Sequence, residues 1–165
     1  MRWDLRLFYL MIISLIYMPI EAELYFEQKQ VKNDIEICAY DDAKNIGFVS
    51  YVKIPLMSFY IIHSLYIYPE HRQQGYGRKL MRYVCGELAR VGATCIYIQS
   101  GPFERVNGYG VRIEDYQERM DYLISFYESM GFKKVDAVTS WLASLLYTIA
   151  NIEEDAQYLM MKKVA

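Results

Sequence analysis

The chain has 165 residues, 54% of them hydrophobic, and a formal net charge of −2 at pH 7. This length suits one domain with a core of its own, and this composition excludes a disordered protein. The near balance of charge argues against a dedicated nucleic-acid binder, which would carry an excess of basic residues.

An apolar run from Leu7 to Met18 follows Arg2 and Arg6 and ends at Pro19. The run is shorter than the roughly 20 residues that a membrane-spanning helix needs, but it has the proportions of a signal peptide. Residues 1–20 are therefore set apart as a hydrophobic segment that is either part of the fold or a signal or anchor. In the second case the protein would be secreted or membrane-tethered. We expect residues 21–165 to form a single domain.

The next part of the chain predicts strands, because it is rich in β-branched and aromatic residues and is broken by turn-like segments. The candidate strands cover residues 23–30, 34–39, 45–54 and 59–68. The last of them is dense in Tyr, Ile and Leu and is the clearest strand in the sequence.

The period of the apolar residues changes after Gly77. Leu80, Met81, Val84, Leu88 and Val91 follow the three-and-four spacing of an amphipathic helix, and Gly92 suits the position just beyond its end. A strand over 94–99, a polar connection over 101–112, a helix to about residue 130, an apolar helix over 141–152 and a strand over 157–164 complete the prediction. This order predicts an α/β fold with a mixed sheet, in which strands joined through a helix pair in parallel.

The most informative segment runs from Ile67 to Leu80, where a strand ends, glycines make a tight turn and a helix begins. The first turn of a helix has unpaired N–H groups and partial positive charge, so it can hold a phosphate group. Gly75 and Gly77 would let a pyrophosphate approach these groups closely. A P-loop motif is absent, and a dinucleotide fingerprint would need a glycine where Leu80 stands. Coenzyme A is the third phosphate-bearing ligand that such a turn could hold, and a glycine pair that only serves packing is the alternative.

Two motifs carry a family resemblance. Residues 72–77, Arg-Gln-Gln-Gly-Tyr-Gly, match the acetyl-CoA motif Gln/Arg-x-x-Gly-x-Gly/Ala of the GNAT superfamily of acetyltransferases. Residues 126–132, Phe-Tyr-Glu-Ser-Met-Gly-Phe, resemble the family's Leu-Tyr-x-x-x-Gly-Phe, and residues 158–163 resemble its last strand. The resemblance covers about residue 34 to the C-terminus.

The resemblance implies a mostly antiparallel central sheet flanked by helices, with a V-shaped acetyl-CoA cleft between two strands. It also implies an N-acetyltransferase that moves the acetyl group of acetyl-CoA directly to a primary amine on a small molecule or a protein. The alternative is a catalytically silent CoA-binding module with a regulatory or assembly role. A homodimer stays open, and no nucleic-acid partner is expected.

The resemblance further assigns the site residues. The expected cofactor-binding residues are Leu65, Ile67, Arg72, Gln73, Gln74, Gly75, Tyr76, Gly77, Arg78, Lys79 and Asp121. Asp121 stands where the family often has an asparagine against the pantetheine arm. Tyr127 is expected beside the sulfur atom, where its hydroxyl would stabilise the departing thiolate.

His63 is the candidate base. It lies two residues before Leu65, so the two-residue period of a strand predicts both side chains on one face. A free imidazole has a pKa of about 6.5, which suits proton transfer near neutrality. The segment from His63 to Gly77 also resembles the arylalkylamine N-acetyltransferases, in which a strand histidine relays the proton of the amine. A packing role for His63 remains open, with Glu104 or Asp121 as substitute bases, and His71 is expected to be a solvated turn residue.

Cys38, Cys85 and Cys95 are scattered without metal-ligand spacing, so no metal site is expected. An odd and dispersed set of cysteines is typical of reduced thiols, which predicts a cytoplasmic protein. A reactive or partner-linked thiol is the alternative.

Overall fold

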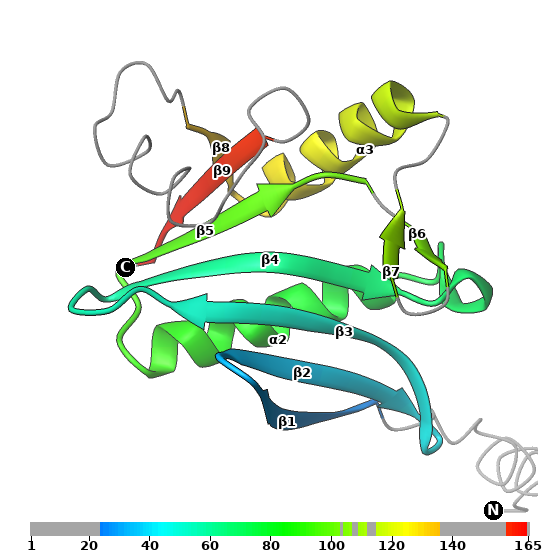
Figure 1. Ribbon diagram of the computed structural model, residues 1–165, viewed down its shortest axis with the longest axis horizontal. Coiled ribbons are helices and arrows are strands. Elements are labelled where there is room, and N and C mark those ends of the chain that lie inside the picture. Colours follow the sequence, from blue (N-terminus) through cyan, green and yellow to red (C-terminus); the bar gives the residue numbers. More distant parts are fainter. Residues whose placement is uncertain (1–23, 103, 107–108, 112–114, 136–157, 165) are drawn as a thin grey trace, which may run out of the picture.

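The computed structural model describes residues 24–102, 104–106, 109–111, 115–135 and 158–164 (Figure 1). The segment 1–20 and the apolar helix predicted over 141–152 lie outside the described residues, and both stay predictions. None of the helices in the described part of the chain has the length and apolar character needed to cross a membrane.

The core of the fold is a seven-stranded sheet in the order β1-β2-β3-β4-β5-β9-β8. Its strands are β1 (Tyr25–Val31), β2 (Asp34–Asp41), β3 (Lys44–Lys53), β4 (Phe59–Ile67), β5 (Cys95–Ser100), β8 (Lys133–Lys134) and β9 (Tyr158–Lys163). β4 and β5 pair in parallel through the helix between them, and the other neighbours pair antiparallel. The predicted mixed and mostly antiparallel sheet is confirmed.

Two helices pack on the sheet through one shared core. They are α2 (Tyr76–Arg90) and α3 (Tyr116–Glu128), and a short 3-10 turn, η1 (Pro69–His71), lies between β4 and α2. Helix α2 buries Leu80, Met81, Val84 and Leu88, four of the five apolar residues that predicted it. These side chains share a cluster with Ile62 of β4 and Ile124 of α3, so one hydrophobic core joins both helices to one face of the sheet. Figure 1 shows α2 lying along strands β2 to β4.

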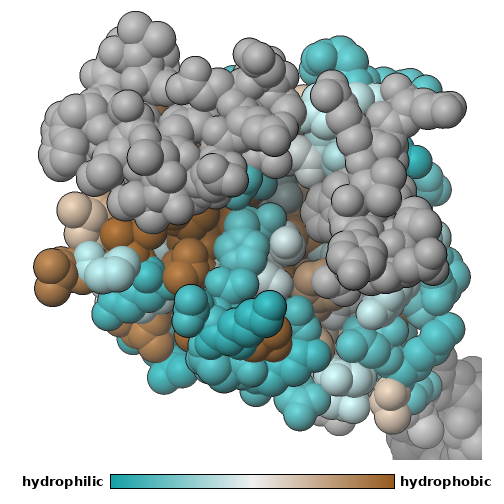
Figure 2. All heavy atoms as spheres, in the orientation of Figure 1, coloured by the Kyte–Doolittle hydropathy of each residue, from teal (hydrophilic) through white to brown (hydrophobic). Residues whose placement is uncertain are grey.

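The opposite face of the sheet holds two smaller apolar clusters. One is built around Ile61 of β4 and Tyr97 of β5, and the other around Phe48 of β3 and Tyr66 of β4. Figure 2 shows brown apolar surface near the loop between β3 and β4, while teal hydrophilic surface extends toward β1 and β2. The same face also has a polar contact: Ser50 of β3 donates to Oε2 of Glu36 at 3.5 Å, and Glu36 pairs with Lys29 at 2.8 Å.

A β-bulge interrupts the alternation of side chains along β4. Ser50 pairs with Ser64 and Tyr51 pairs with Ile62, so His63 is an extra residue in β4. Leu65 packs against the core on the α2 side, whereas His63 contacts Asp34 on the other face. The predicted common face for His63 and Leu65 is therefore wrong, because one inserted residue reverses the alternation.

The same region of β4 is where the sheet opens. The parallel pairing of β4 with β5 ends at Ile62 and Ile98, although β4 continues to Ile67. Figure 1 shows the two strands diverging as a V toward their carboxyl ends. This agrees with the predicted opening between two strands, and it places residues 63–67 beside that opening.

The predicted polar connection over 101–112 has structure of its own. β6 (Glu104–Val106) and β7 (Tyr109–Val111) pair antiparallel as a small second sheet. The sequence missed this hairpin because its strands are only three residues long and hardly show a period. β8 was missed for the same reason.

Candidate functional site

The turn between β4 and α2 presents a row of free backbone donors. The first intrahelical bond of α2 runs from the N–H of Lys79 to the carbonyl of Gly75. Within the part of the chain that the structure describes, no hydrogen bond engages the N–H groups from Gln73 to Arg78. Gly75 is the N-cap, and no side chain caps the helix. These donors form a ready anion site.

The charged side chains in the first turn of α2 have the same sign as the positive end of the helix dipole. The first turn of α2 contains Arg78 and Lys79 and no acidic residue. Cations at the positive end of a helix are unfavourable by a few tenths of a kcal/mol each. Helix α3 follows the usual rule, with Asp115 at its N-cap and Glu118 in its first turn. The contrast within one chain indicates that α2 begins where negative charge is to be bound.

The two glycines of the turn serve different physical needs. Gly75 has φ of +80°, a left-handed conformation that side chains rarely adopt. Gly77 has no such requirement, but a Cβ atom built on it would lie 3.6 Å from Cγ1 of Ile67 and 3.9 Å from Cζ of Phe126. A side chain at Gly77 would therefore project between the end of β4 and α3.

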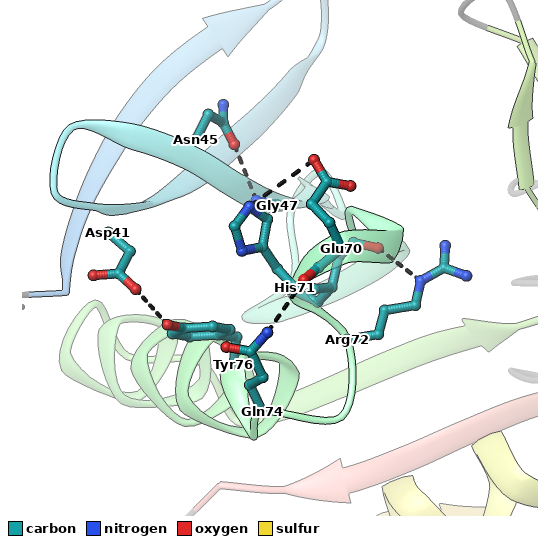
Figure 3. A network of polar contacts seen from close by, with 9 residues as sticks. Asp41, Asn45, Gly47, Glu70, His71, Arg72, Gln74 and Tyr76 are labelled. Atoms are coloured by element: carbon teal, nitrogen blue, oxygen red, sulfur yellow. Dashed lines mark hydrogen bonds and ion pairs between the residues drawn. The ribbon is translucent and has the colours of Figure 1, made fainter.

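Several predicted cofactor-binding side chains brace the turn (Figure 3). The Nε of Arg72 donates to the carbonyl of Ile67 at 2.9 Å, and the Nε2 of Gln74 donates to the carbonyl of Glu70 at 3.2 Å. The hydroxyl of Tyr76 donates to Oδ2 of Asp41, at the end of β2. This bond raises the pKa of Tyr76. These contacts hold the turn in shape, which leaves its amides as the groups available for a ligand.

His71 is not the solvated residue that the sequence predicted. Its side chain is only 15% exposed, and its ring centroid lies 6.3 Å from that of Tyr76 in an edge-on arrangement. Its Nε2 lies 4.0 Å from Oε1 of Glu70. The prediction was wrong because the 3-10 turn rolls this side chain inward against the start of α2.

Asp41 is a positioning residue that the sequence missed. It lies 35 positions from Tyr76, and only the folded register of β2 brings the two together. We expect Tyr76→Phe to lower the free energy of unfolding by about 1 kcal/mol, because it removes the hydroxyl that Asp41 accepts from. The same variant should bind CoA severalfold more weakly, because the first turn of α2 loses the bond that holds it to β2. Urea denaturation and calorimetry with CoA measure the two effects.

Tyr83→Phe is the matched control, since Tyr83 lies on the same helix and stacks its ring on Phe26. The control should keep both values of the wild type. Equal behaviour of the two variants would mean that the bond to Asp41 does not support the turn.

Tyr127 lies inside the core that joins α3 to the sheet. The residue is 4% exposed, and its ring packs edge-on against Phe126 and Phe132 at centroid distances of 5.2 and 6.1 Å. Burial raises the pKa of its hydroxyl above the ordinary value. The hydroxyl therefore stays protonated near neutrality and is a hydrogen-bond donor.

His63 has a carboxylate partner that the sequence missed. Its Nε2 lies 3.4 Å from Oδ1 of Asp34, and the two side chains are 29% and 39% exposed. Asp34 precedes Ile35, which packs on the α2 side, so Asp34 and His63 lie on the other face. Such a pair can fix the ring so that the second nitrogen faces a substrate.

The remaining predicted residues lie around this arrangement. Leu65 and Ile67 pack against the core beside the opening. Arg78 donates to Oγ of Ser129 at 3.0 Å, and the ammonium of Lys79 lies 5.7 Å from the ring of Tyr76. Asp121 is exposed on α3 and accepts a hydrogen bond from Gln117 at 3.1 Å. The cofactor role of Asp121 stays a prediction. Glu104, the other substitute base, lies in β6.

Among the described residues, no group of histidine, cysteine, aspartate and glutamate side chains is arranged to hold a metal ion. No protein with a curated description matches this sequence.

Solved structures with a similar fold include several acetyltransferases. The PaiA N-acetyltransferase of Thermoplasma acidophilum, in complex with coenzyme A, is 18% identical with a TM-score of 0.53, over 79% of this chain and 61% of that protein. The ribosomal-protein-S18-alanine N-acetyltransferase of Escherichia coli is 15% identical with a TM-score of 0.54, over 82% of this chain and 72% of that one. A Bacillus subtilis acetyltransferase in complex with CoA is 11% identical with a TM-score of 0.60, over 87% and 100%. The chain thus spans less than two thirds of the first of these proteins.

Sequence comparison with family models gives a direct assignment. The model described as "Acetyltransferase (GNAT) domain" matches residues 33–134, which include the turn between β4 and α2 and both strands of the opening, β4 and β5. With this match, the V-shaped divergence of β4 and β5 and the uncapped start of α2, the chain belongs to the GNAT acetyltransferase family.

Proposed function

We propose that this protein is an acetyl-CoA-dependent N-acetyltransferase that moves an acetyl group directly to a primary amine. One observation carries the proposal: helix α2 begins without a side-chain cap, without an acidic residue and with two cations in its first turn. That start fits an anionic ligand, and CoA-bound members of the same fold support CoA as that ligand. Residues 21–165 would form the single catalytic domain.

The residues present fit acetyl-CoA. The N–H groups from Gln73 to Arg78 would hold its pyrophosphate, and the absent side chain of Gly77 leaves space between Ile67 and Phe126 for the chain that follows. Leu65 and Ile67 line the edge of β4 that β5 leaves unpaired, where backbone groups can bind an extended arm. When bound, acetyl-CoA would supply an acyl carbon activated as a thioester.

The sheet separates the two candidate catalytic side chains. Tyr127 belongs to the core on the α2 side, and His63 with Asp34 lies on the opposite face. The opening between β4 and β5 starts beside His63. An amine approaching on the side of His63 would therefore meet a thioester that enters from the side of Tyr127.

The reaction then needs a proton acceptor for the amine and a hydrogen-bond donor for the departing thiolate. As the amine nitrogen forms its bond to the acyl carbon, His63 accepts the proton that the nitrogen loses. As the carbon–sulfur bond breaks, its electron pair goes to sulfur, and the Tyr127 hydroxyl donates a hydrogen bond to the thiolate. Asp34 would orient His63, and solvent would return the proton to the sulfur.

The test is release of free thiol from acetyl-CoA with a panel of primary amines, including small amines, polyamines, amino acids and peptides. We expect turnover with at least one amine and mass-spectrometric detection of its N-acetyl product. With that amine, activity should rise with pH, because an amine attacks only in its unprotonated form and needs an unprotonated base. His63→Gln should lower activity at neutral pH and flatten the rise, because glutamine cannot accept a proton.

Tight binding of CoA without turnover of any amine would favour the catalytically silent CoA-binding module. Turnover with an unchanged pH profile in His63→Gln would keep the enzyme but move the base elsewhere, with Glu104 or Asp121 as the next variants. Failure to bind CoA at all would overturn the proposal.

A further inference from the structure

Strand β1 lies at one edge of the seven-stranded sheet. It is the last strand in the order of the sheet, and among the described strands it pairs with β2 alone. Figure 1 shows it at the outer margin of the sheet, beyond β2. An open edge is a template for a further strand, and natural proteins often blunt it with a proline or a charge. The sequence of β1, Tyr-Phe-Glu-Gln-Lys-Gln-Val, has no proline, and its two charges have opposite signs.

The hairpin between β1 and β2 determines which backbone groups lie on this edge. Val31 and Asp34 flank a two-residue turn, and such a closing pair exchanges both of its hydrogen bonds. Inward and outward bonds alternate along a strand, so the N–H and carbonyl groups of Phe26, Gln28 and Gln30 point away from β2. An antiparallel strand added at this edge would bond to these three residues.

Alternate side chains of β1 lie on the face of the sheet opposite α2. They are Tyr25, Glu27, Lys29 and Val31. Tyr25 is 45% exposed and its ring stacks on that of Tyr40 at 4.9 Å, while Val31 is 40% exposed. The ammonium of Lys29 contacts Glu36 at 2.8 Å, yet the side chain is 49% exposed. Strand β1 thus presents an exposed apolar side chain at each end and two opposite charges near its centre.

This order of side chains is self-complementary in one antiparallel register. When Gln28 stands opposite Gln28 of a second copy, Glu27 faces Lys29 and Tyr25 faces Val31, each pair occurring twice. These are the pairs without mutual hydrogen bonds, in which the side chains approach most closely. A shift of two residues in one direction would place Glu27 opposite Glu27, and a shift in the other direction would place Lys29 opposite Lys29. Like charges directly opposite each other are unfavourable, so the charges select one register.

We propose that β1 pairs with β1 of a second copy around a twofold axis at Gln28, so that two chains form a homodimer with one continuous sheet. The three outward-facing residues of each chain would exchange about six backbone hydrogen bonds with the other chain. The ammonium of Lys29 has three donors and can bind Glu36 of its own chain and Glu27 of the second copy together. The contact is the same on both chains, as a closed dimer requires. This assembly does not depend on the proposed function.

Cysteine cross-linking tests the register directly. At the axis, the Cα atoms of the two Gln28 residues would lie about 5.5 Å apart, within the range of a disulfide. We expect Gln28→Cys to form a covalent dimer under mild oxidation, with the linked peptide identified by mass spectrometry. Gln30→Cys is the matched control on the same strand and face. The two Gln30 residues would lie about 13 Å apart, so this variant should form no such link.

Sedimentation velocity of the full chain over a range of concentrations measures the dimer itself. We expect the wild type to sediment with twice the mass of one chain. Glu27→Lys should raise the dissociation constant of the dimer by at least about tenfold, because both charge pairs change from attraction to repulsion. Glu128→Lys makes the same change of charge at an exposed position at the end of α3 and should keep the dimer of the wild type.

A wild type that stays monomeric at every concentration would overturn the inference, whatever covers the edge of β1. A Gln28→Cys variant that links no more than Gln30→Cys would overturn it as well. A dimer that Glu27→Lys leaves unchanged would place the contact on another surface of the molecule. These measurements use neither CoA nor an amine, so their failure would leave the proposed function standing.

Discussion

Tyr127→Phe is expected to lower turnover by about 10²–10⁴-fold while leaving the dissociation constant of acetyl-CoA nearly unchanged. The phenylalanine ring keeps the packing against Phe126 and Phe132, so the core around α3 should persist. What disappears is a buried hydroxyl whose raised pKa keeps it protonated, and which would donate to the sulfur only as the carbon–sulfur bond breaks. Single-turnover kinetics and calorimetry separate the two quantities.

The loss of turnover in Tyr127→Phe should not depend on pH in the neutral range. Because burial raises the pKa of Tyr127, its hydroxyl does not titrate in the neutral range, and its loss should lower the rate by the same factor throughout that range. Tyr122→Phe is the control on α3, since Tyr122 is 68% exposed. A Tyr127→Phe variant with the turnover of the wild type would show that Tyr127 only packs the core.

The sequence predicted those parts of the fold that depend on local pattern. The strand dense in Tyr, Ile and Leu became β4, and the three-and-four spacing after Gly77 became α2. Gly92 adopts the left-handed conformation, with φ of +85°, as expected just beyond a helix. Each of these features is encoded within about fifteen neighbouring residues, so one sequence is enough to read it.

Features that depend on strand register could not be predicted from the sequence. The bulge at His63 is one extra residue in a strand whose composition does not mark it, and it reverses which face each following side chain takes. The contacts Asp34–His63 and Asp41–Tyr76 join residues 29 and 35 positions apart across paired elements. Charges gathered in this way become visible only when the register is known.

Gly77→Val is expected to weaken CoA binding by at least about 100-fold while the domain stays folded. The Cβ atom itself fits, since its nearest contacts are the ordinary distances of 3.6 Å to Ile67 and 3.9 Å to Phe126. The two methyl groups of valine extend beyond it, into the space between β4 and α3 that the cofactor would cross. Calorimetry with CoA measures the affinity, and thermal unfolding reports the fold.

The comparison with Gly77→Ala and Gly75→Val decides what the loss means. Gly77→Ala adds only the Cβ atom and improves helix propensity by about 0.5–1 kcal/mol, so it should be at least as stable as the wild type with a smaller loss of affinity. Gly75→Val is a poorer probe, because φ of +80° strains any side chain whether or not a ligand is present. A graded loss from glycine to alanine to valine at position 77, without a loss of stability, would locate the cofactor against this turn. Full CoA affinity in Gly77→Val would mean that the cofactor takes another path, and the amides of α2 would then bind no pyrophosphate.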